Sequence, residues 1–313
     1  MKILLLGKNG QVGWELQRSL SVLGELVALD RHSPDQCGDL ANLLGLAQTV
    51  RAVRPDVIVN AAAYTAVDKA ESESGLARTV NALAVGMLAQ EAQALGAWLV
   101  HYSADYVFDG SGTRPWRETD GPAPLNVYGQ TKLEGERLIQ AANPRHLIFR
   151  TSWVYGARGG NFAKTMLRLA QERERLTVID DQFGAPTGAE LLADVTAHAI
   201  RQAVHAPALA GLYHVAAGGE TTWFSYSKMT LALAKRSKLA TKLVVKTVDA
   251  VPASTFPAPA RRPHNSRLDT TKLQAAMGLT LPDWTQGVER MLGEILADNH
   301  FIPLVDTLHL KAP

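Results

Sequence analysis

The chain of 313 residues has one cysteine, no long apolar run and no run of basic residues. A single thiol, Cys37, cannot form an internal disulfide, which fits a reducing compartment, and we interpret it as a small buried or half-buried residue. No stretch approaches the roughly 18 apolar residues of a membrane-spanning helix. The four apolar residues at 3–6, which follow one lysine, are too few for the core of a signal peptide. We therefore expect a cytoplasmic protein.

Charge of either sign is not in excess. The 32 basic and 30 acidic residues give a net charge of +2 and are spread along the chain, so no feature favours nucleic acid or an anionic membrane as a partner. The nine histidines include no H-E-x-x-H motif, and a G-x-S-x-G motif is also missing. Zinc-protease and serine-hydrolase functions are therefore not expected.

Apolar, β-rich runs alternate with helical patterns along the chain. The runs are KILLL (2–6), GELVALD (24–30), PDVIVNAAA (55–63), GAWLVHYS (96–103) and HLIFRTSWV (146–154). Nearly continuous apolar runs are typical of strands that are covered on both faces in a parallel sheet. Further strands are expected in LTVIDDQFGAPTG (176–188) and GLYHVAAGG (211–219).

The helical patterns complete an α/β organisation. Val12, Leu16 and Leu20 recur every four residues, and further helices are expected at 76–95, 128–142, 191–204, near 270–278 and at 284–299. The Pro-rich stretch 249–263 reads as a long loop. We predict a Rossmann-type, doubly wound parallel sheet formed by 1–154 and about 186–216, with a smaller substrate domain formed by about 155–185 and 217–313.

Three regularly spaced glycines, Gly7, Gly10 and Gly13, follow the first apolar run and open the first helix. Such spacing is weak evidence alone, since many tight turns share it. Here a predicted strand precedes the glycines, and an acid, Asp30, ends the second strand. This context favours a dinucleotide site, in which the glycines let the backbone approach a pyrophosphate at the helix N-terminus.

The next pair, Asp30 and Arg31, bears on the choice of dinucleotide. An aspartate accepts hydrogen bonds from both ribose hydroxyls of NAD and repels the 2′-phosphate of NADP, whereas a neighbouring arginine can bind that phosphate. We expect NADH to be favoured and NADPH to remain an alternative. A solvated turn at the end of a strand is the competing interpretation of the pair.

The stretch YGQTK places Tyr128 and Lys132 four residues apart, on one face of a helix. An ammonium beside a phenol favours the phenolate, which lowers the pKa of the tyrosine and lets it exchange a proton with an oxygen. Alone, the pair could be a chance surface pair. After a dinucleotide motif and a fourth strand, it indicates a reductase site.

These motifs carry a resemblance. The glycine motif with Y-x-x-x-K resembles the extended short-chain dehydrogenase/reductase family, and within it the chain is similar to the dTDP-4-dehydrorhamnose reductases. The similarity extends over residues 1 to about 290 through blocks in the expected order: NAAAYTAVDKAE, HYSADYVFDG, PLNVYGQTKLEGE, FRTSWVYG, NFAKTML, DQFGAPT and RRPHNSRLD. It implies NAD(P)H-dependent reduction of the 4-keto group of dTDP-4-dehydro-L-rhamnose to dTDP-L-rhamnose, the last step of dTDP-rhamnose synthesis.

The resemblance also implies a role for each matching residue. Tyr128 would be the proton donor, and Lys132 would hold the nicotinamide ribose and lower the pKa of the tyrosine. Asp105 and Trp153 would contact the sugar nucleotide; a turn-capping role and simple core packing are the alternatives. The remaining cofactor contacts would be Gly10, Gln11 and Val12 at the pyrophosphate, Asp30 at the adenosine ribose, Asp39 and Leu40 near the adenine, and Ala63, Tyr64 and Thr65 after the third strand.

One position departs from the family pattern. Family members usually have Thr or Ser directly before the Asp of DYVFDG, whereas this chain has Ala104. The neighbouring Ser103 should point to the opposite face of the strand. We therefore expect a substrate site that lacks one hydroxyl and one hydrogen bond at this position, with a loss of about 1–3 kcal/mol in the transition state.

Two further features are open. Some relatives form Mg²⁺-dependent homodimers with glutamates from both chains, and Glu15, Glu190 and Glu294 match those positions; surface glutamates are the alternative. Arg261, Arg262 and Arg267 lie in the Pro-rich region, where either a diphosphate or solvent is expected to be their partner.

Two other functions compete with reduction. A nucleotide-sugar epimerase or 4,6-dehydratase uses the same scaffold, but dehydratases place an Asp-Glu pair where this chain has SADYVF. A non-catalytic regulatory subunit would keep the cofactor site without the chemistry, and Ala104 favours it. The retained Tyr128 and Lys132 argue against that alternative.

Overall fold

The computed structural model of the chain describes residues 1–297. Its central element is a six-stranded sheet in the order β2-β1-β3-β4-β5-β10, in which all neighbouring strands are parallel. The strands are β1 (Lys2–Leu6), β2 (Glu25–Leu29), β3 (Val57–Asn60), β4 (Trp98–Ala104), β5 (His146–Thr151) and β10 (Gly211–His214). The predicted parallel, Rossmann-type sheet is confirmed.

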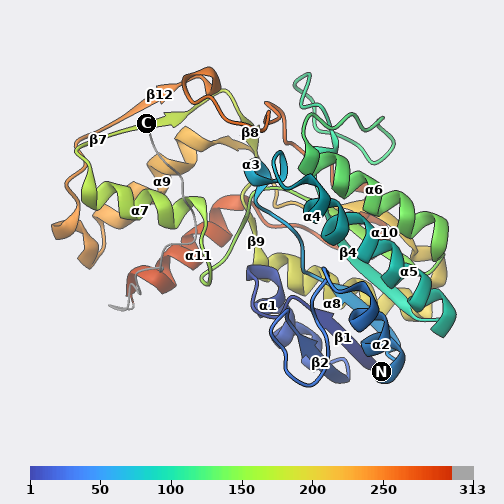
Figure 1. Ribbon diagram of the computed structural model, residues 1–313. Helices are drawn as coiled ribbons and strands as arrows, with labels where there is room; N and C mark the ends of the chain where they lie inside the picture. Colours follow the sequence, from blue (N-terminus) through green and yellow to red (C-terminus); the bar gives the residue numbers. More distant parts are fainter. Residues whose placement is uncertain (298–313) are drawn as a thin grey trace.

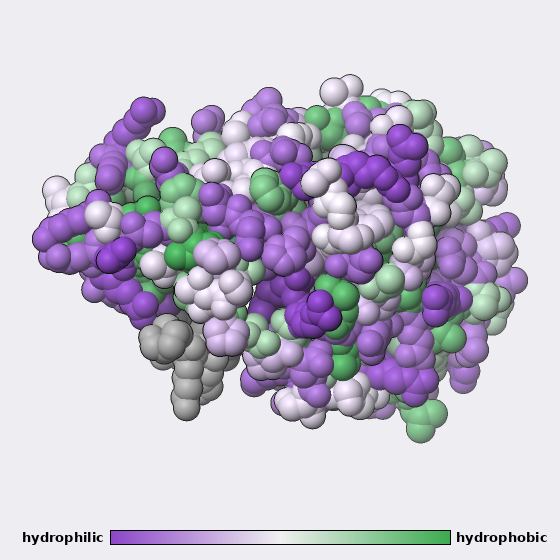
Figure 2. Space-filling view, turned by 90° about the horizontal axis from the view of Figure 1, so that it is seen from above, coloured by the Kyte–Doolittle hydropathy of each residue, from purple (hydrophilic) through white to green (hydrophobic). Residues whose placement is uncertain are grey.

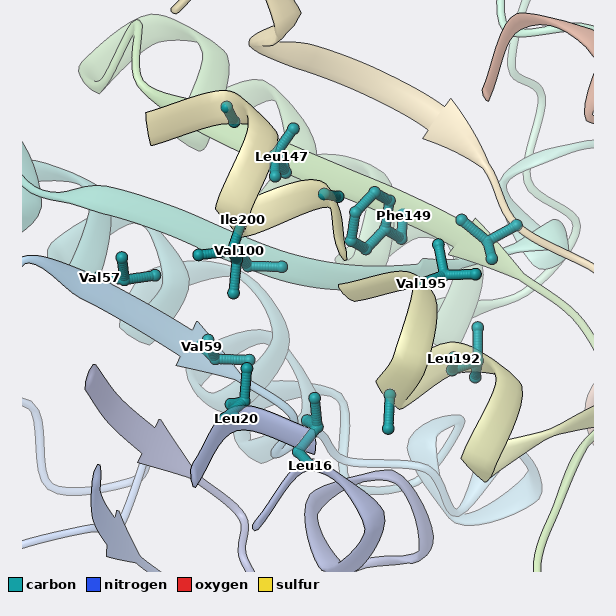
Figure 3. Close-up of a cluster of buried hydrophobic side chains, with 14 of the residues drawn as sticks. Leu16, Leu20, Val57, Val59, Val100, Leu147, Phe149, Leu192, Val195 and Ile200 are labelled. Carbon is teal, nitrogen blue, oxygen red and sulfur yellow. The ribbon is translucent and has the colours of Figure 1, made fainter. Parts of the chain in front are cut away.

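Helices cover both faces of this sheet (Figure 1). One face packs against α1 (Gln11–Ser21), α8 (Ala189–His205) and α10 (Thr271–Met277), and the other against α2 (Leu43–Val53), α5 (Ala84–Leu95) and α6 (Val127–Ala142). Figure 3 shows the first of these cores, where Leu16 and Leu20 of α1 meet Val59 of β3. Because side chains alternate along a strand, Ile3 and Leu5 belong to this core, while Leu4 and Leu6 belong to the other.

The strand order places a binding crevice at one point of the sheet. β1 lies between β2 and β3. The connection from β1 leads to β2 on one side, and the connection from β2 leads back to β3 on the other side of β1. In an open parallel sheet, ligands bind outside the carboxyl ends of the strands at this reversal. The glycine loop, the end of β2 and the loop after β3 all meet there.

A smaller group of elements lies beside the sheet (Figure 1). It contains the parallel pairs β7 (Arg175–Ile179) with β12 (Thr247–Val251) and β6 (Val154–Tyr155) with β9 (Thr187–Gly188), and the antiparallel pair β8 (Phe183–Gly184) with β11 (Thr221–Thr222). Its helices are α7 (Phe162–Glu172), α9 (Trp223–Lys235) and α11 (Trp284–Ala297), which share a core with Tyr155 and Tyr226. The stretch expected to be a long loop at 249–263 thus begins inside strand β12, because residues 247–251 pair with β7.

The predicted division into two domains needs one correction. Residues 271–281 were assigned to the substrate domain, but Leu273, Met277 and Leu281 pack in the core of the sheet beside α8. These apolar side chains belong to the core of the sheet because α10 packs against β10. The remainder of the division stays a prediction, and its residues 298–313 lie outside the described residues.

The helix expected at 76–95 is interrupted. After α3 (Val67–Ala70), it consists of α4 (Ser74–Arg78), a π-helical turn η1 (Thr79–Leu83) and α5. Single π turns in α-helices frequently occur at functional sites. This turn contains Asn81, which is 1% exposed. The remaining short elements are the 3₁₀ turns η2 (Asp105–Val107), η3 (Pro207–Leu209), η4 (Lys238–Lys242) and η5 (Ala253–Thr255).

The surface mixes polar and apolar residues. Figure 2 shows them intermingled on the face seen from above. The large apolar side chains that are most exposed, among them Val22 and Leu44, lie at separate positions along the chain. Within residues 1–297, no helix combines the length and the apolar character that crossing a membrane requires.

One ion pair is buried between the sheet and α6. Arg150 of β5 donates from Nε and Nη2 to the two carboxylate oxygens of Glu136, at 2.8 and 2.6 Å. The side chains are only 4% and 2% exposed. Two charges removed from water in this way depend on each other, because either one alone would remain buried without its counter-charge.

We expect Glu136→Gln to lower the free energy of unfolding by about 3–5 kcal/mol, because it leaves the guanidinium of Arg150 buried without its carboxylate. Urea denaturation followed by circular dichroism measures the change. The control is Glu174→Gln, which removes an exposed partner of Lys246 and should cost less than about 1 kcal/mol. Equal losses in the two variants would contradict the dependence on burial.

Candidate active site

The glycine loop is built for close backbone approach. Gly7 has a φ of 90°, and a Cβ atom there would lie 2.7 Å from the backbone nitrogen of Ala62. A Cβ atom on Gly13 would lie 2.0 Å from the carbonyl oxygen of Gly7. At Gly10, by contrast, the nearest protein atom to such a Cβ is 3.4 Å away. The outer glycines therefore close the turn, while Gly10 borders space that a ligand can enter.

Helix α1 begins at this loop without a capping side chain. Its N-cap residue is Gly10, and no side chain accepts a hydrogen bond from the first turn, which contains Gln11 and Val12. Unpaired N–H groups at a helix N-terminus, together with the helix dipole, favour an anion. The open space at Gly10 and the uncapped turn fit the pyrophosphate of a dinucleotide, as the sequence predicts.

Asp30 lies directly after β2, beside the glycine loop. Its Oδ1 accepts a hydrogen bond from the backbone of His32 at 2.9 Å, and its other oxygen accepts one from Asn9 of the loop. Burial raises the pKa of Asp30, but hydrogen bonds from His32 and Ser33, together with the charges of Lys8 and His32, outweigh it, so that the net pKa is lowered. Asp30 is therefore a fixed carboxylate at the edge of the crevice.

The neighbouring residues differ in exposure. Arg31 is exposed and donates to the ring of His32 at 3.0 Å. Asp39 accepts from the backbone of Ala41 at 3.0 Å, and Leu40 is 3% exposed in the core under α2. Leu40 thus supports the wall of the predicted adenine site largely from inside the protein.

The loop after β3 carries Ala63, Tyr64 and Thr65 and is fixed by Asn81 of the π turn. The backbone nitrogen of Tyr64 donates to Asn81 Oδ1 at 2.8 Å, and Asn81 Nδ2 donates to Tyr64 O at 3.1 Å and to Thr131 Oγ1 at 3.2 Å. One buried amide therefore joins the predicted cofactor loop to α6. Sequence reasoning missed Asn81, whose signal was only an asparagine inside a helical pattern.

The N-terminus of α6 positions Tyr128. Asn126 caps the helix by accepting from the backbone of Gly129 at 2.8 Å, and a Cβ atom on Gly129 would lie 2.1 Å from Tyr106 O. The rings of Tyr106 and Tyr128 meet edge to face, with centroids 5.5 Å apart. Tyr128 is partly buried, and its place is set by this close approach of α6 to η2.

Lys132 follows one turn later on α6 and is 1% exposed. Its Nζ donates to Tyr102 O at 2.5 Å and lies 3.2 Å from His101 Nε2. Burial lowers the pKa of Lys132 to about 8, and Glu136 opposes the decrease.

The expected acidification of Tyr128 is not seen in the chain without its ligands. Burial, with Asp105 and Tyr106 as further causes, raises the pKa of Tyr128 above its usual value. Burial removes the phenol from water and also disfavours the ammonium of Lys132. Tyr128 is thus a phenol, the form that can donate a proton. That Lys132 lowers the pKa of Tyr128 stays a prediction.

Ala104 ends β4, and its register partner on β5 is Thr151. Its methyl group provides no hydroxyl, as expected, and the Oγ atom of the neighbouring Ser103 is buried without a hydrogen-bond partner among the described residues. The next residue, Asp105, is 3% exposed, and its Oδ2 has no partner among the described residues. Burial raises the pKa of Asp105 to about 7, although hydrogen bonds from Ser266 and the backbone oppose the increase.

Trp153 adopts a left-handed backbone conformation, with a φ of 49°. Its ring stacks on Trp223, with centroids 3.6 Å apart, and a Cβ atom on Gly184 would lie 2.8 Å from it. Non-glycine residues with positive φ are uncommon and are worth attention near a site. The ring is partly exposed, so packing on Trp223 leaves part of it accessible, and its contact with the sugar stays a prediction.

The arginines of the Pro-rich region have different partners. Arg262 forms an ion pair with Asp68 at 2.7 Å, and Arg267 pairs with Glu220 at 2.5 Å while its guanidinium covers the ring of Phe183 at 4.3 Å. Two of the three residues are therefore engaged within the chain, by partners that were not among the expected ones, diphosphate and solvent.

The three glutamates predicted to bind a metal are each beside an arginine. Glu190 and Glu294 lie 3.4 and 3.7 Å from Arg290, and Glu15 lies 3.7 Å from Arg18. Burial raises the pKa of Glu190, and Arg290 opposes the increase. Within residues 1–297 of one chain, no group of three His, Cys, Asp or Glu side chains is arranged to hold a metal ion. A site shared between two chains stays a prediction.

Comparisons with known proteins agree with this geometry. The family model described as RmlD substrate binding domain matches residues 1–297. A dTDP-4-dehydrorhamnose reductase from Shigella flexneri is 61% identical over 295 residues, which cover 94% of this chain and 98% of the relative. One from Burkholderia thailandensis is 46% identical over 95% of this chain and 100% of its own length.

Solved structures show the same similarity. A dTDP-4-dehydrorhamnose reductase from Bacillus anthracis, solved in complex with NADP, has a TM-score of 0.83 at 35% identity and covers 94% of this chain and 99% of its own. A UDP-glucose 4-epimerase from Thermus thermophilus in complex with NAD has a TM-score of 0.73 at 20% identity, with 93% and 99% covered, and shares the fold.

We expect Asp105→Asn to be more stable than the parent chain at pH 8, and by a larger margin than at pH 5. A folded-state pKa of about 7, above the ordinary value of 3.8, contributes stability below pH 4 that is lost as the pH rises through 7, because the charged carboxylate must then stay buried. The amide avoids this loss, so the advantage of the variant should grow by about 1–4 kcal/mol between the two pH values. Urea denaturation at both pH values measures it.

The control has the opposite sign. Backbone and side-chain hydrogen bonds from Ser111 lower the pKa of Asp109, so its carboxylate contributes stability above its unfolded pKa, and Asp109→Asn should lose stability at pH 8. Parallel pH dependences of Asp105→Asn and the parent chain would contradict a buried, neutral Asp105.

Proposed function

The chain belongs to the dTDP-4-dehydrorhamnose reductase family, and we propose that the site around Tyr128 reduces the 4-keto group of dTDP-4-dehydro-L-rhamnose to dTDP-L-rhamnose. It is an NAD(P)H-dependent oxidoreductase. The single observation that carries the assignment is the placement of Tyr128 and Lys132 on α6 beside the carboxyl ends of β3 and β4, next to a glycine loop that fits a dinucleotide.

The proposed roles follow from the protonation states. When bound, the reduced nicotinamide supplies a hydride to the carbonyl carbon, so that negative charge develops on the carbonyl oxygen. Tyr128, a phenol in the free chain, donates its proton to this oxygen. Lys132, when protonated, stabilises the resulting phenolate and holds the nicotinamide ribose. Asp105 lies beside Tyr128 and binds the sugar nucleotide from η2.

Cofactor recognition is assigned to the sheet domain. Gly10, Gln11 and Val12 would hold the pyrophosphate at the start of α1, and Asp30 would accept the hydroxyls of the adenosine ribose. The fixed carboxylate of Asp30 favours NADH, while the NADP found with a relative and the exposed Arg31 favour NADPH. We propose that the chain uses both.

The competing functions are less well supported. Epimerases share the fold at 20% identity, but the relatives that are 46–61% identical over nearly their full length are reductases. A regulatory subunit would not need the buried contacts that hold Lys132 and Tyr128. We also propose a cytoplasmic protein whose partners are the nucleotide sugar and a second copy of the chain, with Mg²⁺ shared through Glu15, Glu190 and Glu294.

The assay follows oxidation of NADH and NADPH in the presence of dTDP-4-dehydrorhamnose. We expect the absorbance at 340 nm to fall with formation of dTDP-rhamnose, and we expect Tyr128→Phe to reduce kcat by about 100-fold or more, because the proton donor is lost. The control is Tyr213→Phe, at the far strand β10, which should keep the parent rate. Binding without turnover would support the regulatory alternative, and redox-neutral conversion would support an isomerase.

We expect Ala104→Thr to raise kcat/KM for the same reaction. The added hydroxyl would supply a hydrogen bond to the developing oxyanion, and about 1–3 kcal/mol corresponds to roughly 5- to 150-fold. Ala104→Val, which has the shape of threonine without the hydroxyl, is the matched control and should give no increase. An unchanged rate in the threonine variant would mean that position 104 does not contact the reacting oxygen.

A further inference from the structure

A buried chain of hydrogen bonds joins the loop after β3 to Lys132. The backbone nitrogen of Ala62 donates to Asn60 Oδ1 at 3.1 Å, Asn60 Nδ2 lies 3.2 Å from His101 Nδ1, and His101 Nε2 lies 3.2 Å from Lys132 Nζ. Asn60, His101 and Lys132 are each 1% exposed. No water is needed to complete the chain, because each pair is in direct contact.

The chemistry of each group fixes the direction of the bonds. Asn60 Oδ1 accepts from a backbone N–H group, so the other end of the amide, Nδ2, must be a donor. His101 Nδ1 therefore accepts, and the proton of the neutral imidazole lies on Nε2. Nε2–H then points at Lys132 Nζ, which must offer a lone pair to accept it. An amine has that lone pair, and an ammonium does not.

The alternative protonation state loses a bond. If Lys132 were an ammonium, His101 Nε2 would have to accept, and Nδ1–H would face the amide hydrogens of Asn60. Two donors would then point at each other inside a site closed to water, which is costly. Only the amine satisfies every group of the chain, with Tyr102 O as a further acceptor for Nζ.

We propose that His101 is a positioning residue that sets the charge of Lys132: oriented by Asn60, its Nε2–H donates to Nζ and stabilises the amine over the ammonium. Lys132 thus titrates near physiological pH instead of staying permanently charged. The consequence for turnover rests on the proposed function, in which the ammonium stabilises the phenolate of Tyr128. Turnover then requires a proton that the hydrogen-bond chain does not favour.

Other charges surround this site. The titratable and charged groups on the elements that pack against α6 are His101 and Tyr102 of β4, His146 and Arg150 of β5, Asp105 and Tyr106 of η2, Asp68 and Lys69 of α3, Arg78 of α4 and Glu91 of α5. On α6 itself, Tyr128 lies one turn before Lys132 and Glu136 one turn after, the latter bound to Arg150. Within residues 1–297, His101 is the titratable side chain in hydrogen-bonding contact with Nζ. Burial lowers the pKa of Lys132, and burial together with the charge of Lys132 lowers the pKa of His101, so each group disfavours the charged form of the other.

The first test uses the parent protein without ligands. Long-range ¹H–¹⁵N NMR of ¹⁵N-histidine-labelled protein distinguishes the two tautomers, and the signal of His101 is assigned by its loss in His101→Gln. We expect an unprotonated Nδ1 and a protonated Nε2 at pH 9, where Lys132 is mostly an amine because its pKa is about 8. A protonated Nδ1 at pH 9 overturns the proposal, whether or not the protein reduces the sugar.

The second test reverses the direction of the hydrogen bonds between Asn60, His101 and Lys132. In Asn60→Asp, the carboxylate accepts from the backbone of Ala62 and from His101 Nδ1–H, so Nε2 becomes an acceptor for an ammonium. We expect kcat/KM of the parent to fall roughly tenfold from pH 7 to pH 9, as Lys132 loses its proton near pH 8, and we expect less than a twofold fall in Asn60→Asp. The same histidine spectrum should show the Nδ1–H tautomer in this variant.

A buried carboxylate can impair folding, so a second variant keeps the test decisive. In His101→Gln the amide can rotate and accept from Nζ, and we expect the basic limb of the pH profile to move upward here too. The matched control is His146→Gln, at the first residue of β5. Its basic limb should stay at the pH of the parent. If the basic limb of the pH profile stays at the pH of the parent in both Asn60→Asp and His101→Gln, the proposal is overturned. Failure of the sugar assay alone would refute the function and leave the tautomer result intact.

Discussion

The structure depends on how charge is accommodated where α6 packs on the sheet. This helix buries an ammonium or amine at Lys132 and a carboxylate at Glu136, both about 1% exposed, against strands that are otherwise apolar. Each is matched by a residue of the sheet, His101 for the lysine and Arg150 for the glutamate. Because an unmatched charge here would be costly, the two contacts fix the position of α6 along the strands. Because Tyr128 lies on the same helix, these contacts also fix its position.

Backbone approach is the second constraint, and it acts at both ends of the site. Gly7 and Gly13 let the glycine loop close against the loop after β3 and leave room at Gly10. Gly129 lets α6 approach η2 so closely that any side chain there would collide with Tyr106 O. The dinucleotide crevice and the proton donor are thus placed by glycines on opposite sides, while the polar side chains between them set the charge.

The site of this chain is a variant of a reductase site. The relatives are reductases over nearly their full length, yet the position before Asp105 is an alanine, and the nearby hydroxyl of Ser103 is buried without a partner. Burial also disfavours charged side chains in this site. It raises the pKa of Tyr128 and shifts Asp105 and Lys132 toward their neutral forms.

The sequence alone determined the features that are local or periodic. Apolar runs bounded by turns predicted the parallel strands, the spacing of Gly7, Gly10 and Gly13 after a strand predicted the cradle, and the four-residue step from Tyr128 to Lys132 predicted a shared helix face. Family resemblance added the reaction. Only the tertiary structure decided which distant polar groups meet: Asn60 with His101, His101 with Lys132, Arg150 with Glu136, and Asn81 with the loop at Tyr64. It also placed residues 271–281 against the sheet and buried Tyr128 enough to raise the pKa of its phenol. Spacing along the chain encodes which residues share a face, whereas burial and long-range partners, which set protonation, arise only when strands and helices pack.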